Sequence, residues 1–297
     1  MFEIAIVSGK GGTGKTTISS SLLTLFIESD KKVLGVDADI EAPDLILAMG
    51  GGKEINREEI WQSVYATINY EECINCLECY TTCQFKAITI EEGFPKIIKE
   101  LCEGCKTCSI VCPTKAITYI TRKTGDVVIF DNKITKIVTG YLEIGMRNSG
   151  LMVDIIREKA WKIAQEEDYE GIIIDSAPGI GCPVISSLKG VNYAILVLEP
   201  TPMSLKAATR IIEITKHFGI KTGIVVNKFD IYESYVKKIE KWVAENNLTF
   251  LGKIPFSEKI PEAYNNLQPV IKYYPESNVA EAIREIYNIT IEEIGGE

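Results

Sequence analysis

The chain has 297 residues, 46% hydrophobic and 25% charged, so it carries enough apolar material for a sizeable core. Its net charge of −9 argues against binding nucleic acid or an anionic membrane through bulk charge. We find no apolar run near the roughly 18–20 residues that a membrane span needs. The single histidine, His217, argues against histidine-based catalysis or a histidine zinc site.

The first residues and the cysteines bear on the compartment. Residues 2–7 look like a strand and not like a signal peptide, and the chain has nine cysteines. In a reducing compartment, thiols are more often metal ligands or redox groups than structural disulfides. We therefore expect a cytoplasmic protein whose cysteines do chemistry.

The predicted elements alternate between strand and helix. Residues 2–9 predict a strand and a turn, residues 15–29 a helix, and residues 31–39 a short apolar strand that ends in acids. After residue 145 the alternation resumes, with helices over 149–167, 204–218, 234–247 and 277–294 and strands over 171–179, 193–200, 222–230 and 249–256. This order predicts an α/β fold with a mostly parallel sheet.

Between residues 68 and 121 the pattern changes to a duplication. Adding 29 to Cys73, Cys76, Cys79 and Cys83 gives Cys102, Cys105, Cys108 and Cys112, and the following Lys-Ala-Ile-Thr also repeats. We expect an inserted domain over 68–121, within a main domain formed by 1–67 and 122–297. Residues 121–145 predict strands or a hairpin that leads back to the main sheet.

The stretch GKGGTGKT, residues 9–16, follows a predicted strand and opens a predicted helix, as a phosphate-binding loop does. Its backbone N–H groups and the helix N-terminus would hold phosphates. Lys15 would reach the β- and γ-phosphates, and Thr16 would bind Mg²⁺. The expected ATP contacts in this loop are Gly11, Gly12, Thr13, Gly14, Lys15, Thr16 and Thr17.

The second lysine of this loop, Lys10, carries a resemblance. KGGTGKTT resembles the deviant Walker A signature of the MinD/ParA/Mrp and nitrogenase-iron-protein ATPases, which are P-loop proteins of the SIMIBI type. The resemblance implies a homodimer that forms around ATP, with Lys10 acting on the partner's nucleotide. It therefore implies ATP hydrolysis, with Lys10 and Lys15 as catalytic residues.

The resemblance also implies roles for three acids and a switch. Asp37 and Asp39 follow a strand end, where we expect Asp39 to position the attacking water and Asp37 to support Mg²⁺, although the two roles could be exchanged. Asp175 would hold a Mg²⁺-bound water. Pro178 and Gly179 resemble the second switch, whose backbone senses the γ-phosphate.

Two later segments resemble the adenine-contacting segments of the same family. Asn227 would hydrogen-bond the base, and Pro255 and Phe256 would lie against it. An ordinary strand-to-helix turn is the alternative for both.

Each cysteine repeat has the spacing C-x₂-C-x₂-C-x₃-C, which is typical of bacterial ferredoxins with two [4Fe–4S] clusters. In that arrangement the fourth cysteine of each repeat binds the other cluster. We therefore expect one cluster on a first cysteine set and another on a second cysteine set. The first set is Cys73, Cys76, Cys79 and Cys112; the second is Cys83, Cys102, Cys105 and Cys108. Zinc is the rival ligand, although a Cys₄ zinc site usually has two C-x₂-C pairs.

Taken together, the chain resembles MinD-superfamily ATPases that carry an inserted α+β, ferredoxin-like domain. The resemblance implies an ATPase coupled to electron transfer with an unidentified redox partner, or alternatively a carrier that assembles iron–sulfur or metal cofactors for client proteins. A MinD- or ParA-type positioning ATPase ranks lower, because residues 282–297 are acidic and no basic patch is visible, so we expect neither membrane nor nucleic-acid binding. The ninth cysteine, Cys182, is either a small packed residue near the switch or a redox or interface group.

Overall fold

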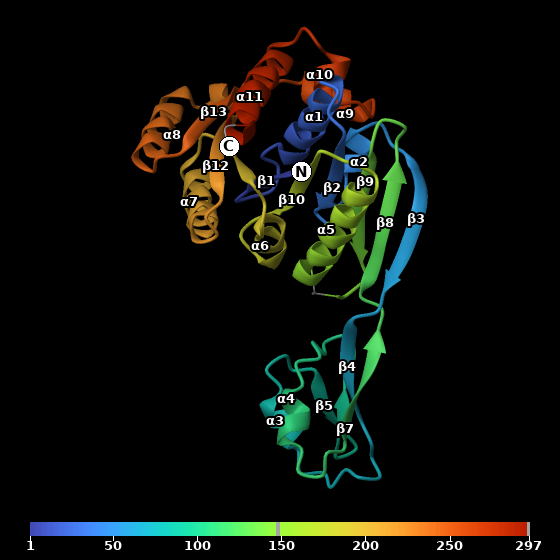
Figure 1. Ribbon diagram of the computed structural model, residues 1–297. Helices are drawn as coiled ribbons and strands as arrows, with labels where there is room; N and C mark the ends of the chain where they lie inside the picture. The colour runs from blue at the N-terminus through green and yellow to red at the C-terminus, as the bar shows by residue number, and fades with distance from the viewer. Residues whose placement is uncertain (147–148, 296–297) are drawn as a thin grey trace. The chain divides into compact units, whose positions relative to one another are not determined.

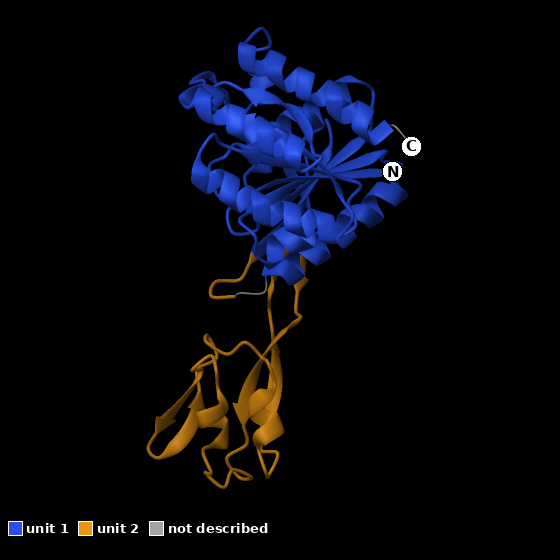
Figure 2. Cartoon of the chain, turned by 90° about the vertical axis from the view of Figure 1, so that its left-hand side faces the viewer, with its two compact units in different colours: residues 1–57, 127–141, 149–297 blue, residues 58–126, 142–148 orange. Residues whose placement is uncertain are grey.

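The computed structural model describes residues 1–146 and 149–295, which divide into two compact units (Figure 2). The P-loop unit comprises residues 1–57, 127–141 and 149–297, of which 296–297 lie outside the described residues. The cysteine unit comprises residues 58–126 and 142–148, of which 147–148 lie outside the described residues. None of the described helices combines the length and apolarity that crossing a bilayer requires.

A nine-stranded sheet in the order β13-β12-β11-β1-β10-β2-β9-β8-β3 forms the centre of the P-loop unit (Figure 1). Its strands are β1 (Phe2–Ser8), β2 (Val33–Ala38), β3 (Lys53–Ile60), β8 (Gly125–Asp131), β9 (Lys136–Leu142), β10 (Gly171–Pro178), β11 (Tyr193–Leu198), β12 (Lys221–Asn227) and β13 (Thr249–Ile254). Neighbours from β13 to β9 pair in parallel, which confirms the expected α/β fold with a mostly parallel sheet.

Helices cover this sheet. They are α1 (Lys15–Glu28), α2 (Leu45–Ala48), α5 (Ser149–Glu166), α6 (Cys182–Leu188), α7 (Pro202–His217), α8 (Glu233–Glu245), α9 (Lys259–Asn265), α10 (Val270–Tyr273) and α11 (Asn278–Gly295), with a short 3₁₀ turn at Phe229–Ile231. Apolar residues of α1, α2, α10 and α11 bury one face of the sheet in a single large core. The strands are apolar along most of their length because the sheet is covered on both sides.

Strand β3 was not expected from the sequence. Its residues KEINREEI are exposed except for Ile60, and they do not alternate between apolar and polar. The strand lies at the edge of the sheet, where charged side chains are tolerated and protect the open edge. Hydrophobic periodicity therefore gives no signal for an exposed strand at the edge of the sheet.

The cysteine unit contains two small antiparallel sheets and two short helices. These are β4 (Ser63–Ile68) paired with β7 (Ile117–Arg122), β5 (Ile88–Glu91) paired with β6 (Phe94–Ile97), and helices α3 (Glu78–Thr82) and α4 (Thr107–Val111). The expected insert, 68–121, lies inside this unit, which is longer because β4 pairs with β7 and Thr124 hydrogen-bonds Ser63.

Candidate nucleotide site and cysteine cavities

The loop between β1 and α1 is shaped by two glycines. Gly12 and Gly14 have φ of 73° and 93°, the left-handed region that side chains rarely adopt. A Cβ on Gly14 would also lie 2.3 Å from the amide nitrogen of Asn227. These constraints explain why the loop needs glycine at both positions and how its backbone turns toward the start of α1.

Lys15, the first residue of α1, is buried at the base of this loop. Its Nζ donates a hydrogen bond to Ser8 Oγ at 3.1 Å, and Ser8 Oγ donates to the Lys10 carbonyl at 2.7 Å. A buried ammonium with a single hydroxyl acceptor retains donors for an anion. The arrangement fits the expected role of Lys15 in holding phosphate.

Three polar side chains surround Thr16, the expected Mg²⁺ ligand. Its hydroxyl lies 2.6 Å from Asp175 Oδ2 and 3.1 Å from Asp44 Oδ1, while Ser19 donates to Asp175 Oδ1 at 3.0 Å. Burial, with a smaller contribution from the Asp44 charge, raises the pKa of Asp175 to about 7, although the hydrogen bonds from Thr16 and Ser19 and the Lys15 charge oppose this rise. A divalent cation would relieve this excess of buried negative charge.

Asp44 was not expected from the sequence. It precedes α2 and accepts a hydrogen bond from Tyr264 at 3.3 Å as well as its contact with Thr16. Burial, and then the Asp44 charge, raise the pKa of Tyr264 to about 12. The available signal was a third aspartate, five residues after Asp39, in the same strand-end segment.

Asp37 and Asp39 have different surroundings. Asp37 is fully buried and accepts N–H groups from Asp39 at 3.1 Å and Leu45 at 2.8 Å, so it shapes the loop that carries the other acids. Burial, followed by the Asp175 charge, raises the pKa of Asp37. Asp39 is half-buried and lines a cavity beside the loop; burial raises its pKa also, although the Lys15 charge opposes this.

That cavity has a volume of about 470 Å³, within the range of small-ligand pockets. It brings together most of the expected contacts. Its lining includes Gly11, Gly12, Gly14, Lys15, Thr16, Thr17, Asp39, Asp44, Pro178, Asn227 and Phe256. Asn227 also donates to the Thr13 carbonyl at 2.7 Å and so braces the loop. Pro255 instead lines a neighbouring cavity between β13 and α11.

The second switch segment follows β10. Gly179 has φ of 102°, and its N–H donates to the Ser8 carbonyl at 2.9 Å. This bond ties the segment to the strand that leads into the phosphate loop. A movement of the phosphate loop would therefore be transmitted to Gly179 through this hydrogen bond.

Lys10 lies on the outer edge of the loop and forms an ion pair with Glu199 of the same chain. Glu199 also accepts from Lys228 at 2.7 Å, and Lys228 donates to the Gly12 carbonyl at 3.0 Å. The Lys10 side chain is 40% exposed. In this single chain, Lys10 is held by Glu199 and does not line the cavity beside the phosphate loop.

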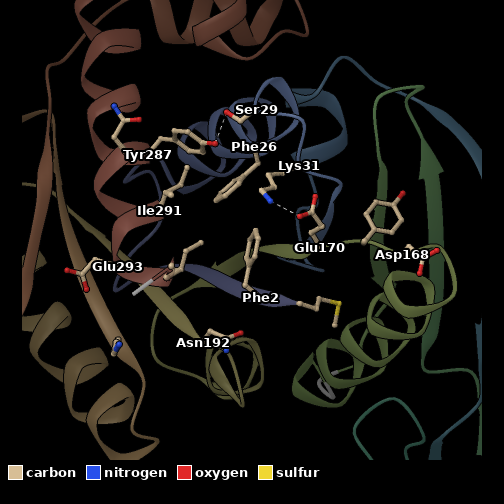
Figure 3. A pocket seen from close by; sticks show the side chains of 16 residues that line it. Phe2, Phe26, Ser29, Lys31, Asp168, Glu170, Asn192, Tyr287, Ile291 and Glu293 are labelled. Atoms are coloured by element: carbon tan, nitrogen blue, oxygen red, sulfur yellow. Dashed lines mark hydrogen bonds and ion pairs between the residues drawn. The ribbon is translucent and has the colours of Figure 1, made fainter. Parts of the chain in front are cut away.

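A larger hollow of about 990 Å³ lies at the opposite end of the sheet (Figure 3). Phe26 packs there against Phe2 in a tilted arrangement and against Tyr287 edge to face, and Lys31 pairs with Glu170 at 2.7 Å. The hollow is at the amino ends of parallel strands, whereas ligands of open α/β sheets bind at the carboxyl ends. Because its aromatic rings pack on one another and this ion pair is already formed, we assign the nucleotide site to the smaller cavity.

Two cavities in the cysteine unit are each lined by four cysteines. One is lined by the first cysteine set, Cys73, Cys76, Cys79 and Cys112, and the other by the second cysteine set, Cys83, Cys102, Cys105 and Cys108. The structure thus groups three cysteines of each repeat with the fourth cysteine of the other. Among residues 1–146 and 149–295, no three Cys, His, Asp or Glu side chains form a group that would hold a single metal ion.

The loops around both cavities share an unusual backbone. Leu77 and Lys106, related by the shift of 29, have φ of 61° and 67°, and Lys86 and Lys115 have φ of 51° and 57°. Such conformations are costly for residues other than glycine and persist where the surroundings require them. Their recurrence in both repeats indicates that the duplicated loops serve the same purpose.

A family model, the CobQ/CobB/MinD/ParA nucleotide binding domain, matches residues 4–270. The chain belongs to this family. The phosphate loop, its two lysines and the acids around Thr16 all lie within the matched residues.

Other members of the family and solved structures are similar along nearly the whole chain. The uncharacterised protein MJ0578 of Methanocaldococcus jannaschii is 36% identical over 97% of this chain and 95% of its own length. MJ0823 of the same organism, named an uncharacterised ATP-binding protein, is 25% identical over 96% of both chains.

Solved MinD structures have the same fold. The cell division ATPase MinD of Pyrococcus furiosus matches with a TM-score of 0.61 and 20% identity, over 99% of this chain and 98% of its own. MinD of Pyrococcus horikoshii, solved with Mg-ADP, has a TM-score of 0.59 at 20% identity, over 97% of this chain and 95% of its own. At these identities the likeness concerns the fold.

Cys182 of this family member is exposed and begins α6. A Cβ added to Gly150 would lie 2.8 Å from the Cys182 Cβ, so this glycine allows α5 to approach α6 closely. The backbone and Cβ of Cys182 are thus closely packed, as expected for a small packed residue, while the residue as a whole is exposed to solvent.

Proposed function

We propose that this chain is an ATP-hydrolysing iron–sulfur protein that couples ATP-dependent dimer closure to electron transfer. One observation carries the proposal: a single chain joins the phosphate loop of this family to two cavities, each lined by four cysteines from both repeats. An ATPase that only positions cargo has no need for such cavities.

In the proposed nucleotide site, Lys15 and the loop N–H groups bind the phosphates of ATP. Thr16 binds Mg²⁺, and Asp175 and Asp44 hold its water ligands, since both carboxylates lie within 3.1 Å of the Thr16 hydroxyl. Asp39 orients the attacking water, and Asn227 and Phe256 contact the base. The Mg-ADP in the Pyrococcus horikoshii MinD structure supports this assignment.

The cysteine cavities fit [4Fe–4S] clusters by the chemistry of their donors. A cubane is bound by four thiolates, each on a different iron, so its ligands surround a volume and do not converge on one ion. Four cysteines around each cavity, three from one repeat and one from the other, support this assignment. Each cluster would accept and release one electron.

The sheet offers a route for coupling. Asp37 ends β2, β2 pairs with β9, and the order continues through β8 to β3, the two strands that lead into and out of the cysteine unit. The Thr139 hydroxyl of β9 also donates to the Asp37 carbonyl at 3.3 Å. A change in the segment that holds Asp37 and Asp39 would therefore act on the strands from which the cysteine unit extends.

A second candidate, a carrier that delivers clusters to client proteins, is favoured by the exposure of Cys76 and Cys105, one cysteine of each set. Exposed ligands are accessible to an acceptor's thiols. Transfer of iron to an apo-ferredoxin within minutes, faster than transfer through free iron and sulfide, would support the carrier and argue against a fixed electron relay. The positioning ATPase is disfavoured because α11 buries Val279, Ile283 and Ile286 in the core.

The decisive measurement is the metal content of the chain purified without oxygen. We expect eight iron and eight acid-labile sulfide per chain, brown absorbance that dithionite bleaches, and hydrolysis of ATP. A folded chain with zinc or no metal would refute the iron–sulfur part of the proposal.

The dimer is tested by Lys10→Ala. We expect ATP turnover to fall by about 100-fold or more, as for a trans-acting cation, and ATP-dependent dimerisation to disappear, with nucleotide still bound. Lys237→Ala, an exposed lysine of α8, is the control and should leave both unchanged. Survival of turnover and dimerisation in Lys10→Ala would exclude the trans role.

A further inference from the structure

The two halves of the cysteine unit can be compared position by position, because strand pairing follows the same shift of 29 as the cysteines. Ala66 of β4 pairs with Tyr119 of β7, and Pro95 of β6 pairs with Ile90 of β5. Adding 29 to Ala66 gives Pro95, and subtracting 29 from Tyr119 gives Ile90. Each residue near one cavity therefore has a defined counterpart near the other.

Burial does not distinguish the two cavities. Each cysteine set has one buried member, Cys79 or Cys102, one exposed member, Cys76 or Cys105, and two of intermediate exposure. Solvent exposure is one determinant of a cluster's reduction potential, and it is matched here. A difference between the sites must therefore come from charges or hydrogen bonds.

Two hydrogen-bond donors to the second cysteine set have no counterpart at the first, although Cys112 of the first set also accepts backbone N–H groups of Thr114 and Lys115. The Ala66 N–H donates to Cys102 Sγ at 3.4 Å, and the Thr107 hydroxyl lies 3.4 Å from Cys105 Sγ. The counterpart of Ala66 is Pro95, which has no N–H, and it lines the other cavity. The counterpart of Thr107 is Glu78, a carboxylate that cannot donate when ionised.

A third group near this set is weaker. The Tyr119 hydroxyl lies 3.9 Å from Cys108 Sγ, but it also donates to Ser109 at 2.7 Å. Its counterpart, Ile90, has no polar group. Tyr119 is therefore a further polar group beside the second cysteine set, but the difference between the two sites does not depend on it.

The first cysteine set has one side-chain donor of its own, Thr114, 3.7 Å from Cys112 Sγ, whose counterpart is Phe85. The Ala87 N–H donates to Cys83 Sγ at 3.4 Å, and its counterpart, Ala116, hydrogen-bonds Cys112, so this position does not separate the sites.

Charged residues do not alter the comparison. Lys106 and Glu103 both line the cavity of the second set. Their counterparts, Leu77 and Ile74, line the cavity of the first set and carry no charge. The two charges are opposite in sign and offset each other.

We propose that Thr107 and the Ala66 N–H make the cluster on the second cysteine set the easier of the two to reduce. Hydrogen bonds to cysteine sulfur stabilise the reduced cluster, which carries one more negative charge. One electron from an external donor, such as dithionite, would then rest on the second set, leaving the first set oxidised. This inference rests on the proposed function, and it gives the electron a direction: from the first set to the second.

The test is a reductive titration of the anaerobic holoprotein, followed by electron paramagnetic resonance. We expect two separate one-electron steps. Thr107→Val should lower the equilibrium constant of the first reduction step about tenfold, which corresponds to about 59 mV, and leave the second step in place. Thr81→Val is the matched control: its hydroxyl donates to the Glu78 carbonyl and not to a sulfur.

The outcomes separate the two proposals. A chain without iron overturns both the proposed function and this inference. A chain with eight iron atoms whose clusters reduce together, or whose second step moves in Thr107→Val, overturns this inference and leaves the proposed function standing. Circular dichroism and iron content of each variant show whether a shift reflects the donor and not loss of folding.

Discussion

The P-loop unit and the cysteine unit differ in what holds them together. The core of the P-loop unit combines residues from the sheet and five helices, with rings such as Phe26 and Tyr193 fully or almost fully buried. The buried core of the cysteine unit consists of Ala66, Cys79, Ala87, Ile88, Cys102 and Ile117, two of which are cysteines. The first unit can fold by burying apolar surface, whereas the second has few apolar residues to bury and, under the proposed function, would be stabilised by its thiolate–iron bonds.

The largest expected effect follows from removing iron. If thiolate–iron bonds replace a core, chelation under oxygen should unfold the cysteine unit and leave the P-loop unit folded. We expect proteases to cut within 58–126 at least about tenfold faster in iron-free protein, measured by mass spectrometry of the fragments. ADP binding by the same sample is the control. Equal cleavage rates with and without iron would contradict the contrast between the units.

The reverse experiment disables the other unit. Lys15→Met removes a buried charge that faces phosphate, so ADP affinity should fall by about 100-fold, as measured by calorimetry. Iron content should not change, because the cysteine unit does not use this lysine. Lys31→Met, at the opposite end of the sheet, should bind ADP normally. Loss of iron in Lys15→Met would show that the units are not independent.

A pH experiment sharpens the picture of the nucleotide site. The pKa of Asp175 is raised to about 7, so the folded, metal-free chain holds a proton that the unfolded chain releases near pH 4. Stability from this group is therefore lost as pH rises from about 4 to about 7, by roughly 4 kcal/mol in total.

Asp175→Asn isolates this contribution, because asparagine does not titrate. The melting temperature of the variant relative to the wild type should rise with pH through this window and level off above it. A constant difference would mean that Asp175 keeps an ordinary pKa. At pH 8, Mg²⁺ with ADP should reverse the order of the two melting temperatures, so that the wild type melts at a higher temperature than Asp175→Asn.

The smallest effect concerns the brace of the phosphate loop. Asn227→Ala removes the 2.7 Å bond to the Thr13 carbonyl, which should cost about 1–3 kcal/mol of unfolding free energy and about tenfold in ADP affinity. Thermal unfolding and calorimetry measure the two. Asn246→Ala, at the end of α8, is the control and should leave affinity unchanged. If Asn227→Ala binds ADP like the wild type, the bracing role is wrong.

Local patterns allowed much of this molecule to be predicted. The phosphate loop and Asp39 follow strands that are evident from apolar runs, and Asp175 lies near the end of another. The spacing of the repeats, taken with the bacterial ferredoxin arrangement that it resembles, predicted the cysteine grouping. Features set by distant residues could not be seen. The Lys10–Glu199 pair joins positions far apart in the chain, and the contact of Asp44 with Thr16 depends on how the loop held by Asp37 folds back.

The expected adenine contacts show the same limit. Phe256 lines the nucleotide cavity, but its neighbour Pro255 lines another. Adjacent residues of an extended segment point to opposite sides, and nothing local indicates which side faces a ligand. The Phe256 N–H is held by Asp230 at 2.8 Å, a contact that only the folded chain provides.

The way the chain leaves and rejoins the sheet has an evolutionary consequence. The Thr124 N–H donates to the Ile60 carbonyl at 2.6 Å, so the two ends of the intervening segment are hydrogen-bonded neighbours. A cassette whose ends meet in this way can be spliced into a hairpin between β3 and β8 without altering the strands on either side. A chain with a plain turn at this position would still have every strand of the nine-stranded sheet.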